Sequence, residues 1–422
     1  MKKKKILWLS GTCGLYKEDK QKNGMSPNGT EMIKKKFDIN GGGWISSLQR
    51  EIMRFHSNDF ELEVAFPWSI NFDDECNGVK YHGIKRMKRA CFFYKKKQRE
   101  ELRRIKEIID KSSPDIIHVF GSELSFGLAC TITDIPVVIH IQGILSTCYD
   151  FWLPANISRT EYLLRNPRFF FSSMSLKKFI KREQLMLSKC QYLMGRTEWD
   201  RTTASLLAPQ AKYFYCSEML RPTIYYSENT WEPQKRNKKI IATVISSPSY
   251  KGGETILNTA QRLKQFTDIE FEWNVYGVFD LKLSSKLTGI NLKNVNVKTM
   301  GIVNVEELKE ALIKSDVYVH PSYIENSSNA VCEAQLLGVP VIATNVGGMS
   351  SLIEDKENGL LIPSRDANML AARIKDVICD EKLALRLSQN GRTCALERHK
   401  PESIVKQVID IYDSILHQAN NI

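Results

Sequence analysis

The sequence lacks the features of several large protein classes. No apolar run reaches the roughly 18 residues of a transmembrane helix, and there is no repeat of fixed period and no low-complexity tract. The ten cysteines form no Cys-x-x-Cys pair, and none has the spacing of a zinc finger. Several of them lie within apolar runs instead, which is typical of reduced thiols in a cytosolic protein. A membrane-spanning chain, a repeat protein and a small zinc or disulfide module are therefore excluded.

The common cofactor motifs are also missing. The sequence has no Gly-x-Gly-x-x-Gly fingerprint, no phosphate-binding loop that ends in Gly-Lys-Ser/Thr, and no EF-hand. It has no Asp-x-Asp triad either, and the adjacent pair Asp73 and Asp74 is more simply explained as surface charge. We therefore expect no dependence on nicotinamide, flavin or calcium.

What remains is an ordinary globular composition with a basic balance. The 422 residues are 42% hydrophobic and 26% charged, which suits two domains that each bury a core. The net charge of +12 favours anionic partners such as nucleotides or lipid head groups. Only four apolar residues separate the N-terminal lysines from Ser10, too few for a signal peptide, so we expect a buried strand there.

Short apolar runs alternate with helical patterns along the chain, which is typical of parallel sheets with crossover helices. We predict an α/β protein of two Rossmann-like doubly wound domains that face each other across a cleft. The first domain is placed at 1–225, the second at 226–400, and a C-terminal helix at 401–422 crosses back to the first domain. The polar stretch Tyr225–Lys239 suits a linker. In such pairs ligands bind at the carboxyl ends of the strands, hence in the cleft.

The stretch Val317–Gly348 carries the most chemical information. A buried strand runs into a loop with Glu325, and a helix that starts near Ser328 carries Glu333. Two carboxylates at this spacing can face one site, and the backbone N–H groups of a helix start attract phosphate. On its own, each glutamate is more simply a solvated charge at a helix end. The N–H groups in question belong to Asn326, Ser327, Ser328 and Asn329.

Two turns resemble ligand-binding segments more weakly. Lys251 lies after the first strand of the second half, where a cation at a helix start suits a diphosphate, although a single exposed lysine is usually just solvated. Gly41, Gly42 and Gly43 precede the first long helix, where they either present amides to a ligand or form a flexible turn.

The Val317–Gly348 stretch resembles the E-x7-E signature of retaining glycosyltransferases of the GT-B fold, and specifically glycosyltransferase family 4. The likeness begins at the His-Pro-Ser before Glu325, continues through EAQLLGVPVIATNVGG and ends with NGLLIP at 358–363. In the first half it includes PDIIHVFG at 114–121 and GRTEWDR at 195–201.

The resemblance implies roles for individual residues. Glu333 would bind the ribose hydroxyls of a nucleotide, Glu325 would approach the donor hexose, and the amides near Asn326–Asn329 would contact sugar and phosphate. Lys251 matches the lysine of the family's Lys-Gly pair. Gly347 would let the backbone approach the ligand.

The chain departs from the family pattern at two places. The family has an arginine five or six residues before Lys251, whereas this chain has Ile245 and Ser246, so either another base such as Arg196 compensates or the affinity for the donor is weaker. Gln142 stands where relatives place a histidine that contacts the donor sugar, while His140 nearby is more simply a core residue. The glycine turn with Gly42 and Gly43 would face the donor phosphates and the acceptor.

A basic segment suggests a surface for membranes. Lys85–Lys106 holds eleven lysines and arginines against two glutamates, around Phe92 and Phe93. It suits the anionic surface of a membrane, but it could equally be a solvated helix face with its aromatic residues in the core. No motif for nucleic-acid binding is present, so we expect no nucleic-acid partner.

We therefore expect a retaining glycosyltransferase that moves a hexose from a nucleoside diphosphate sugar to a hydroxyl acceptor such as a lipid-linked glycan. It would act in the synthesis of a cell-surface polysaccharide or glycolipid, in the cytoplasm or at the inner membrane surface. The resemblance implies no bound metal, because helix amides and Lys251 would stabilise the leaving diphosphate. The alternatives are a nucleotide-sugar epimerase of the same fold and a non-catalytic nucleotide-sugar-binding protein.

Overall fold

The computed structural model describes residues 3–22, 43–86, 94–151, 153, 157–165, 168–246, 249–277 and 281–419. The chain forms two compact units. Unit 1 comprises Met1–Ser146, Pro167–Met219 and Lys400–Ile422, and unit 2 comprises Thr147–Asn166 and Leu220–His399.

These bounds differ from the predicted ones in two places. The change to unit 2 comes at Leu220 instead of after residue 225, because the side chains of Leu220 and Ile224 are buried in the hydrophobic core of unit 2. The segment Thr147–Asn166, which we expected in the first domain, belongs to unit 2.

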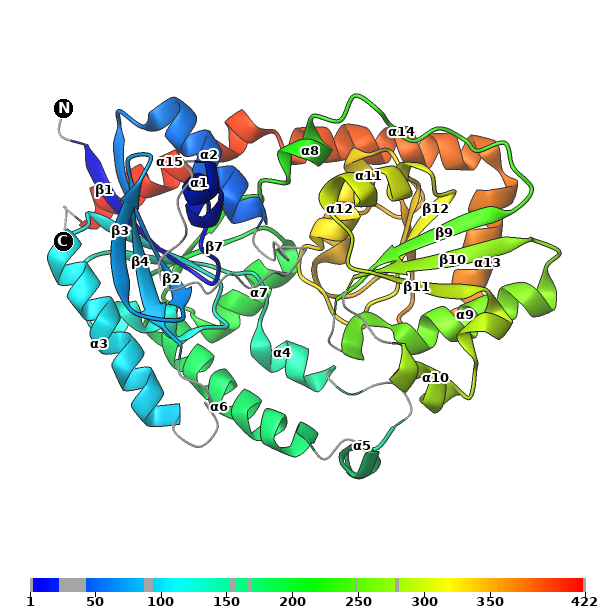
Figure 1. The fold of residues 1–422 in the computed structure, drawn as a ribbon, viewed down its shortest axis with the longest axis horizontal. Helices are drawn as coiled ribbons and strands as arrows, with labels where there is room; N and C mark the ends of the chain where they lie inside the picture. The colour runs from blue at the N-terminus through cyan, green and yellow to red at the C-terminus, as the bar shows by residue number, and fades with distance from the viewer. Residues whose placement is uncertain are drawn as a thin grey trace. The chain divides into compact units, whose positions relative to one another are not determined.

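Unit 1 is built on a sheet of eight strands in the order β3-β4-β2-β1-β5-β6-β7-β8 (Figure 1). All neighbouring strands are parallel except β3 and β4, which form an antiparallel hairpin. The central strand β1 contains four consecutive buried apolar residues, Ile6–Leu9, as expected for a strand that helices cover on both faces. The strands are β1 (Lys4–Ser10), β2 (Phe60–Trp68), β3 (Phe72–Cys76), β4 (Val79–Lys85), β5 (Ile116–Phe120), β6 (Val137–His140), β7 (Tyr192–Gly195) and β8 (Lys212–Tyr215).

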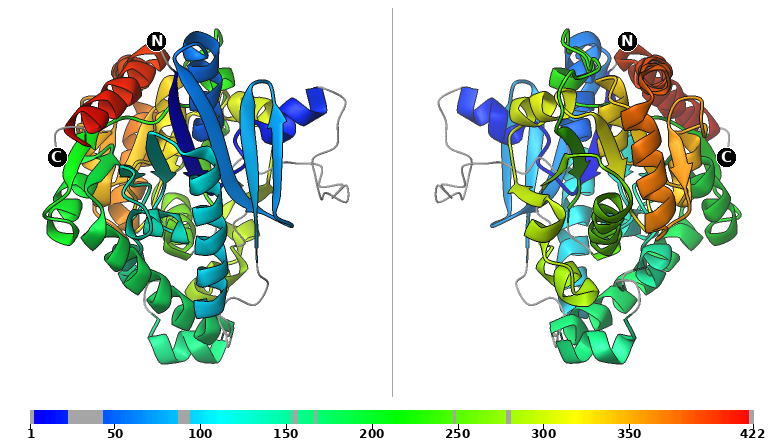
Figure 2. Two further views of the ribbon diagram at one scale, coloured as in Figure 1. Left: turned by 90° about the vertical axis from the view of Figure 1, so that its left-hand side faces the viewer. Right: turned by 90° about the vertical axis from the view of Figure 1, so that its right-hand side faces the viewer.

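The helices of unit 1 include the last helix of the chain. This helix, α15, lies beside α2 (Figure 2). Its buried face, from Ile404 to Ile415, belongs to the same hydrophobic cluster as β1. The Tyr412 hydroxyl accepts a hydrogen bond from Trp8 Nε1 at 3.0 Å and lies 2.7 Å from His118 Nδ1. The helices are α1 (Tyr16–Lys22), α2 (Gly43–His56), α3 (Tyr94–Ser112), η1 (Ser125–Thr131), α4 (Leu145–Asp150), which continues into unit 2, α6 (Arg168–Lys189), α7 (Glu198–Leu207) and α15 (Pro401–Ala419).

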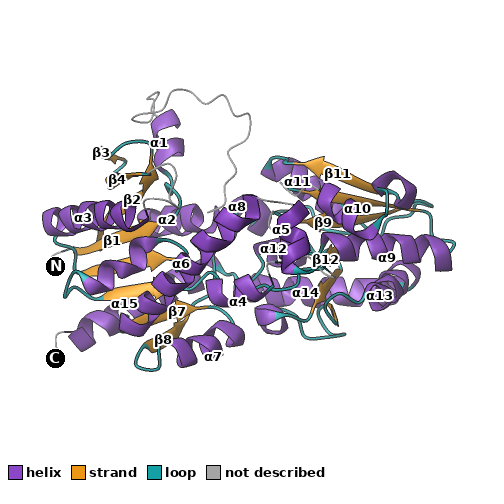
Figure 3. Ribbon diagram, turned by 90° about the horizontal axis from the view of Figure 1, so that it is seen from below, coloured by secondary structure: helices purple, strands orange, loops and turns teal. Residues whose placement is uncertain are grey.

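Unit 2 is built on six parallel strands in the order β11-β10-β9-β12-β13-β14. Helices α9 and α13 lie side by side against this sheet (Figure 3). The strands are β9 (Lys239–Val244), β10 (Phe271–Tyr276), β11 (Val297–Gly301), β12 (Val317–His320), β13 (Val341–Thr344) and β14 (Leu360–Ile362). The helices are α5 (Arg159–Arg165), α8 (Pro222–Tyr225), η2 (Ser249–Lys251), α9 (Gly253–Phe266), α10 (Lys282–Thr288), η3 (Leu292–Val295), α11 (Val305–Ile313), α12 (Asn329–Leu336), η4 (Gly347–Ser351), α13 (Ala367–Cys379) and α14 (Glu381–Arg398).

The segment predicted as a polar linker is anchored to unit 2. The side chain of Trp231 is buried in the core of that unit, and its Nε1 donates a hydrogen bond of 2.7 Å to the carbonyl of Ser315. The Trp231 backbone N–H donates to the carbonyl of Leu337 at 2.8 Å. Among the described residues, no helix is both long enough and apolar enough to cross a bilayer.

Candidate active site

The strand order of unit 2 identifies one edge of its sheet as the natural ligand site. The chain first adds strands on one side of β9 and then returns to add β12, β13 and β14 on the other side. In an open parallel sheet, loops diverge at such a reversal, and ligands bind there at the carboxyl ends of the strands. Lys251 follows β9 and Glu325 follows β12, so these two predicted residues flank the point of reversal.

Glu325 and Lys251 are in direct contact. Glu325 Oε1 accepts a hydrogen bond from Lys251 Nζ and another from Ser322 Oγ at 2.8 Å, and it lies 2.9 Å from His320 Nε2. The other carboxylate oxygen, Oε2, has no hydrogen-bond partner among the described residues. Burial alone would raise the pKa of Glu325, but the charge of Lys251 and the bond with His320 outweigh burial and hold the pKa well below its usual range. The carboxylate is therefore ionised, and one oxygen is available to accept a hydrogen bond.

His320 is itself held from its other side. Its Nδ1 lies 3.1 Å from the hydroxyl of Tyr318, two residues earlier on β12. Burial raises the pKa of Tyr318 well above its usual value, and the nearby charges of Glu325 and Glu333 raise it further. The charges of both predicted glutamates therefore lie near the same buried hydroxyl.

Two glycines allow the loops of this edge to approach one another. Gly347 has φ of +53°, and a β-carbon at this position would lie 1.8 Å from the carbonyl oxygen of Glu325. Gly252 has φ of +80°, and a β-carbon there would lie 2.0 Å from the carbonyl oxygen of Pro321. The close approach at Gly347 in the structure is to the Glu325 backbone, and its expected role in letting the backbone approach a ligand stays a prediction.

The start of α12 lies directly after the Glu325 loop. Ser328 is the N-cap residue, and its side chain makes no capping hydrogen bond to the first N–H groups of the helix. Ser328 and Asn326 are buried, whereas Ser327 and Asn329 are partly exposed. The positive end of the α12 dipole is thus placed beside the Glu325 loop, as predicted.

Glu333, in the middle of α12, has a partner that the sequence analysis did not identify. Arg221 Nε donates to Glu333 Oε1 at 2.6 Å, and a second Arg221 nitrogen donates to Oε2. Glu333 is buried, with 6% of its side chain exposed, whereas 28% of the Arg221 side chain is exposed. The two side chains form a bidentate pair, which fixes the plane of the carboxylate.

A second unpredicted cation, Arg365, lies after β14 on the same sheet edge. Its backbone φ is +66°, a left-handed conformation that residues other than glycine rarely adopt. Its guanidinium carbon lies 4.5 Å from the centre of the Tyr323 ring. The backbone N–H of Tyr323 donates to the carbonyl of Tyr250, the neighbour of Lys251. Arg365 is exposed and has no ion-pair partner among the described residues.

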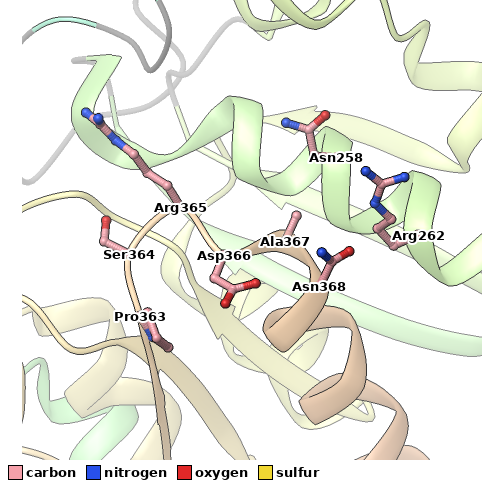
Figure 4. A pocket seen from close by; sticks show the side chains of 8 residues that line it. All are labelled: Asn258, Arg262, Pro363, Ser364, Arg365, Asp366, Ala367 and Asn368. Carbon is pink, nitrogen blue, oxygen red and sulfur yellow. The ribbon is translucent and has the colours of Figure 1, made fainter.

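Arg365 also lines a cavity of about 520 Å³ between the start of α13 and the middle of α9 (Figure 4). Asn258 and Arg262 of α9 form the opposite wall, and the side chain of Arg365 points away from that of Arg262. None of the predicted donor-binding residues lines this cavity. We therefore place the candidate site at the Lys251–Glu325 contact and not in the cavity.

The remaining predicted residues belong to unit 1. Gln142 follows β6, Gly43 is the first residue of α2, and Gly42 lies outside the described residues. Arg196 follows β7, and its buried side chain is paired with Glu218 at 3.3 Å and lies over the Trp44 ring. The roles expected for these residues stay predictions.

The carboxyl edge of the unit 1 sheet also holds a buried carboxyl group that we did not predict. Glu183 of α6 accepts hydrogen bonds from the Ser122 hydroxyl at 2.5 Å and from the backbone N–H of Leu145 at 2.9 Å. Burial raises the pKa of Glu183 to about 7, and the neighbouring charge of Glu123 adds to this effect. Since its bonds tie the loops after β5 and β6 together, its simplest role is to hold the turn that contains Gln142.

No group of three or more His, Cys, Asp or Glu side chains within the described part of the chain is arranged to hold a metal ion. None of the nine cysteines that the structure describes is in a disulfide bond. The site residues that sequence reasoning missed are Arg221, Arg365, His320 and Ser322. His320 and Ser322 stand in the His-Pro-Ser segment at the end of β12, which could have identified them. Nothing in the sequence pairs Arg221 with a residue 112 positions away.

Residues 227–393 match the family described as "Glycosyl transferases group 1". A curated relative, the capsular polysaccharide biosynthesis glycosyltransferase CapM of Staphylococcus aureus, is 31% identical over 104 residues, which cover 25% of this chain and 27% of the relative. The matches to the curated relatives span less than half of their length, between 26% and 45%.

Solved structures resemble the chain over nearly its whole length. Sucrose-phosphate synthase from Thermosynechococcus elongatus has a TM-score of 0.72 at 16% identity, with 98% of this chain and 100% of that chain covered. The Anabaena protein HepE, solved in complex with UDP and glucose, has a TM-score of 0.64 at 16% identity, with 97% and 99% covered. The predicted fold class, two Rossmann-like doubly wound domains of the GT-B type, is confirmed.

Proposed function

Since residues 227–393 form a domain of the glycosyl transferases group 1 family, we propose that this chain transfers a hexose from a nucleoside diphosphate sugar to a hydroxyl acceptor. The acceptor is a precursor of a polysaccharide or glycolipid, a role supported by the printed function of the CapM relative. The complex of the structurally similar HepE with UDP and glucose supports a nucleotide and a hexose as the two parts of the donor.

The contact between Lys251 and Glu325 carries this proposal. It lies at the reversal point of the unit 2 sheet, beside the start of α12. Lys251 and the N–H groups of α12 supply positive charge for a diphosphate, while Glu325 Oε2 accepts a hydrogen bond from a hydroxyl of the sugar. A nucleoside diphosphate sugar carries these two kinds of group next to each other.

We propose that the anomeric configuration is retained and that no protein nucleophile attacks the sugar. Glu325 Oε1 is already occupied by Lys251, Ser322 and His320, which suits a carboxylate that holds a substrate in place. The leaving diphosphate then takes the proton of the acceptor hydroxyl on the same face of the sugar. The bond from the sugar to the diphosphate breaks while the bond to the acceptor oxygen forms. The linkage of the product, determined by NMR, tests retention.

We further propose that the reaction needs no bound metal ion. The charge that develops on the leaving diphosphate is stabilised by Lys251 and the α12 amides. Arg365 is the second cation, in place of the arginine that the family has at the position of Ile245 or Ser246, since it lies on the same sheet edge with no carboxylate partner. Transfer should be equally fast in EDTA and in magnesium, and a rate that depends on magnesium would contradict the proposal.

The first experiment is a thermal-shift panel of UDP-, GDP- and ADP-sugars, followed by mass analysis of the products. A transferase adds a hexose to an acceptor and releases the nucleoside diphosphate. An epimerase converts the donor without any acceptor, and a binding protein raises the melting temperature without turnover. Glu325→Gln keeps the shape of the side chain and removes its charge, so it should abolish transfer; unchanged transfer would remove Glu325 from the site.

A membrane surface is proposed for the basic segment Lys85–Lys106. Its residues 87–93 lie outside the described residues, and the rest lies on β4 and α3. The exposed side chains of Lys95, Lys96 and Arg99 have no carboxylate partner in the described part of the chain. Tyr94 is not available for insertion, because its ring packs against Phe179. The proposal therefore relies on charge, about 1 kcal/mol for each basic residue near an anionic bilayer.

Sedimentation with vesicles that contain anionic lipid tests this surface. The triple variant Lys95→Glu, Lys96→Glu and Arg99→Glu should lose binding at low salt. The matched control reverses three exposed lysines of unit 2, at 286, 293 and 382. No binding of the unaltered chain to such vesicles, or equal losses in both variants, would rule the surface out.

A further inference from the structure

We infer that Arg221 is a positioning residue for nucleotide recognition: it orients the Glu333 carboxylate so that both of its oxygens can accept the vicinal hydroxyls of a ribose. This inference rests on the proposed function, because it assumes that Glu333 faces the nucleoside of the donor. It adds a residue just before α8, far from the E-x7-E segment in the sequence, to the binding site.

The geometry of the pair leaves room for a diol. An ionised carboxylate offers about four lone-pair positions, two on each oxygen. Arg221 uses one position on each oxygen of Glu333, through Nε on Oε1 and a terminal nitrogen on Oε2. One position on each oxygen remains, and two neighbouring hydroxyl groups are the donors that match it. The two hydrogen bonds from Arg221 therefore set the plane of the Glu333 carboxylate, and each oxygen can still accept a hydrogen bond from a ligand.

The burial of Glu333 strengthens the hydrogen bonds that the oriented carboxylate can make with a ligand. Only 6% of the Glu333 side chain is exposed, so water competes weakly with a ligand for the two oxygens. The two hydrogen bonds from Arg221 fix the direction in which these oxygens can accept further hydrogen bonds.

A purely structural role is the competing explanation, since Arg221 also ties the segment before α8 to α12. Unit 2 contains a matched control for that role. Arg236 pairs with Asp316 at 2.6 Å, with 28% of the arginine side chain and 8% of the aspartate side chain exposed. This pair has nearly the same burial as Arg221 and Glu333, but Asp316 is not on α12 and does not belong to the E-x7-E segment.

The test compares ribonucleotides with 2′-deoxyribonucleotides. Binding of UDP, GDP and ADP and of their 2′-deoxy counterparts is measured by calorimetry for the full chain and for Arg221→Gln, Arg221→Lys and Arg236→Gln. We expect the unaltered chain to bind its preferred ribonucleotide about ten- to hundredfold more tightly than the deoxy form, the value of one hydrogen bond to a charged group. Arg221→Gln should lower this ratio towards one, mainly by weakening the ribonucleotide. Arg221→Lys restores the charge without the fork and should recover only part of the ratio.

The outcomes separate the inference from the proposed function. Arg236→Gln should keep the full ratio even if it lowers the melting temperature as much as Arg221→Gln does. A full ratio in Arg221→Gln, or equal losses in both variants, overturns the inference while nucleotide binding stands. No preference for ribose in the unaltered chain also overturns it. If none of the three nucleoside diphosphates binds to the unaltered chain, the proposed function itself fails.

Discussion

The α-carbon of Gly347 approaches the Glu325 carbonyl so closely that a β-carbon on it would lie 1.8 Å from that oxygen. The backbone N–H of the next residue, Gly348, donates a hydrogen bond of 3.0 Å to the same carbonyl. The loop after β13 therefore fixes the backbone of Glu325, while Lys251, His320 and Ser322 fix its side chain.

Gly347→Ala should therefore damage both stability and transfer. The control is Gly289→Ala, because Gly289 has a similar φ of +70° but nothing within 4 Å of a β-carbon. The left-handed backbone alone should cost the control about 1 kcal/mol in the free energy of unfolding. Gly347→Ala should cost more and lower kcat/KM about a hundredfold, because the loop that holds Glu325 must shift. Equal effects in urea unfolding and in the transfer assay would show that the close contact is unimportant.

Lys251→Met should make transfer sensitive to acid. In the unaltered chain the pKa of Glu325 is held well below its usual range, so this carboxylate stays ionised between pH 5 and pH 8. Without Lys251, burial still disfavours the charged form, so the pKa should rise. The ratio of kcat/KM at pH 5 to that at pH 8 should then fall, whereas the exposed-residue control Lys264→Met should keep the ratio of the unaltered chain. Superimposable pH profiles would show that Lys251 does not set the charge of Glu325.

Arg365→Gly should weaken nucleoside diphosphate binding without a large loss of stability. Arg365 and the exposed Lys356 both have left-handed backbones, with φ of +66° and +69°. Glycine relieves this strain at either position, which offsets the greater freedom of glycine in the unfolded chain, so neither variant should lose more than about 1 kcal/mol of stability. Only Arg365→Gly should weaken nucleoside diphosphate binding, by about tenfold or more, because only it removes the second cation. Unchanged binding by calorimetry would exclude Arg365 from the diphosphate site.

Unit 1 should lose stability in mild acid. Burial lowers the pKa of His118 from its ordinary 6.5 to about 3 in the folded chain. Between these two pH values the unfolded chain binds a proton that the folded chain does not, so the free energy of unfolding falls as the pH drops below 6.5. The loss should be about 2 kcal/mol at pH 5.

Hydrogen exchange in peptides from β1 and β5 measures this loss in unit 1 separately from unit 2. His118→Phe removes one titrating ring and should make the pH dependence less steep. Part of the dependence should remain, because burial also lowers the pKa of His140, whose ring stacks on His118 at 5.5 Å. An identical slope in the variant would contradict the assignment to His118.

The alternation of apolar runs and helical patterns predicted the architecture well. Strands β1 and β12 lie where the sequence predicted buried strands, because Ile6–Leu9 and Val317–Val319 form continuous apolar runs. The hairpin of β3 and β4 was not predicted, since its sequence around Asp73 and Asp74 is rich in charge and lies at the sheet edge. The acidic pair expected as plain surface charge in fact bonds with neighbouring elements, Asp73 with His82 at 2.8 Å and Asp74 with Tyr16 at 2.8 Å.

The site was predictable where its residues lie close together in the sequence. Glu325, Glu333 and the start of α12 belong to one stretch, so a single pattern located them. Arg221 and Arg365 meet that stretch only through the tertiary fold, and no local pattern marks either residue. The burial of Trp231 in the unit 2 core was not predicted for a similar reason, because its neighbours in the sequence are polar.

Helix α15 completes the core of unit 1 although it follows the whole of unit 2 in the sequence. During synthesis, the whole of Leu220–His399 is made before the residues that bury Trp8 and His118. The apolar face of unit 1 that α15 covers therefore stays uncovered until unit 2 has been made. Unit 1 is therefore the first unit whose synthesis begins and the last whose synthesis is completed.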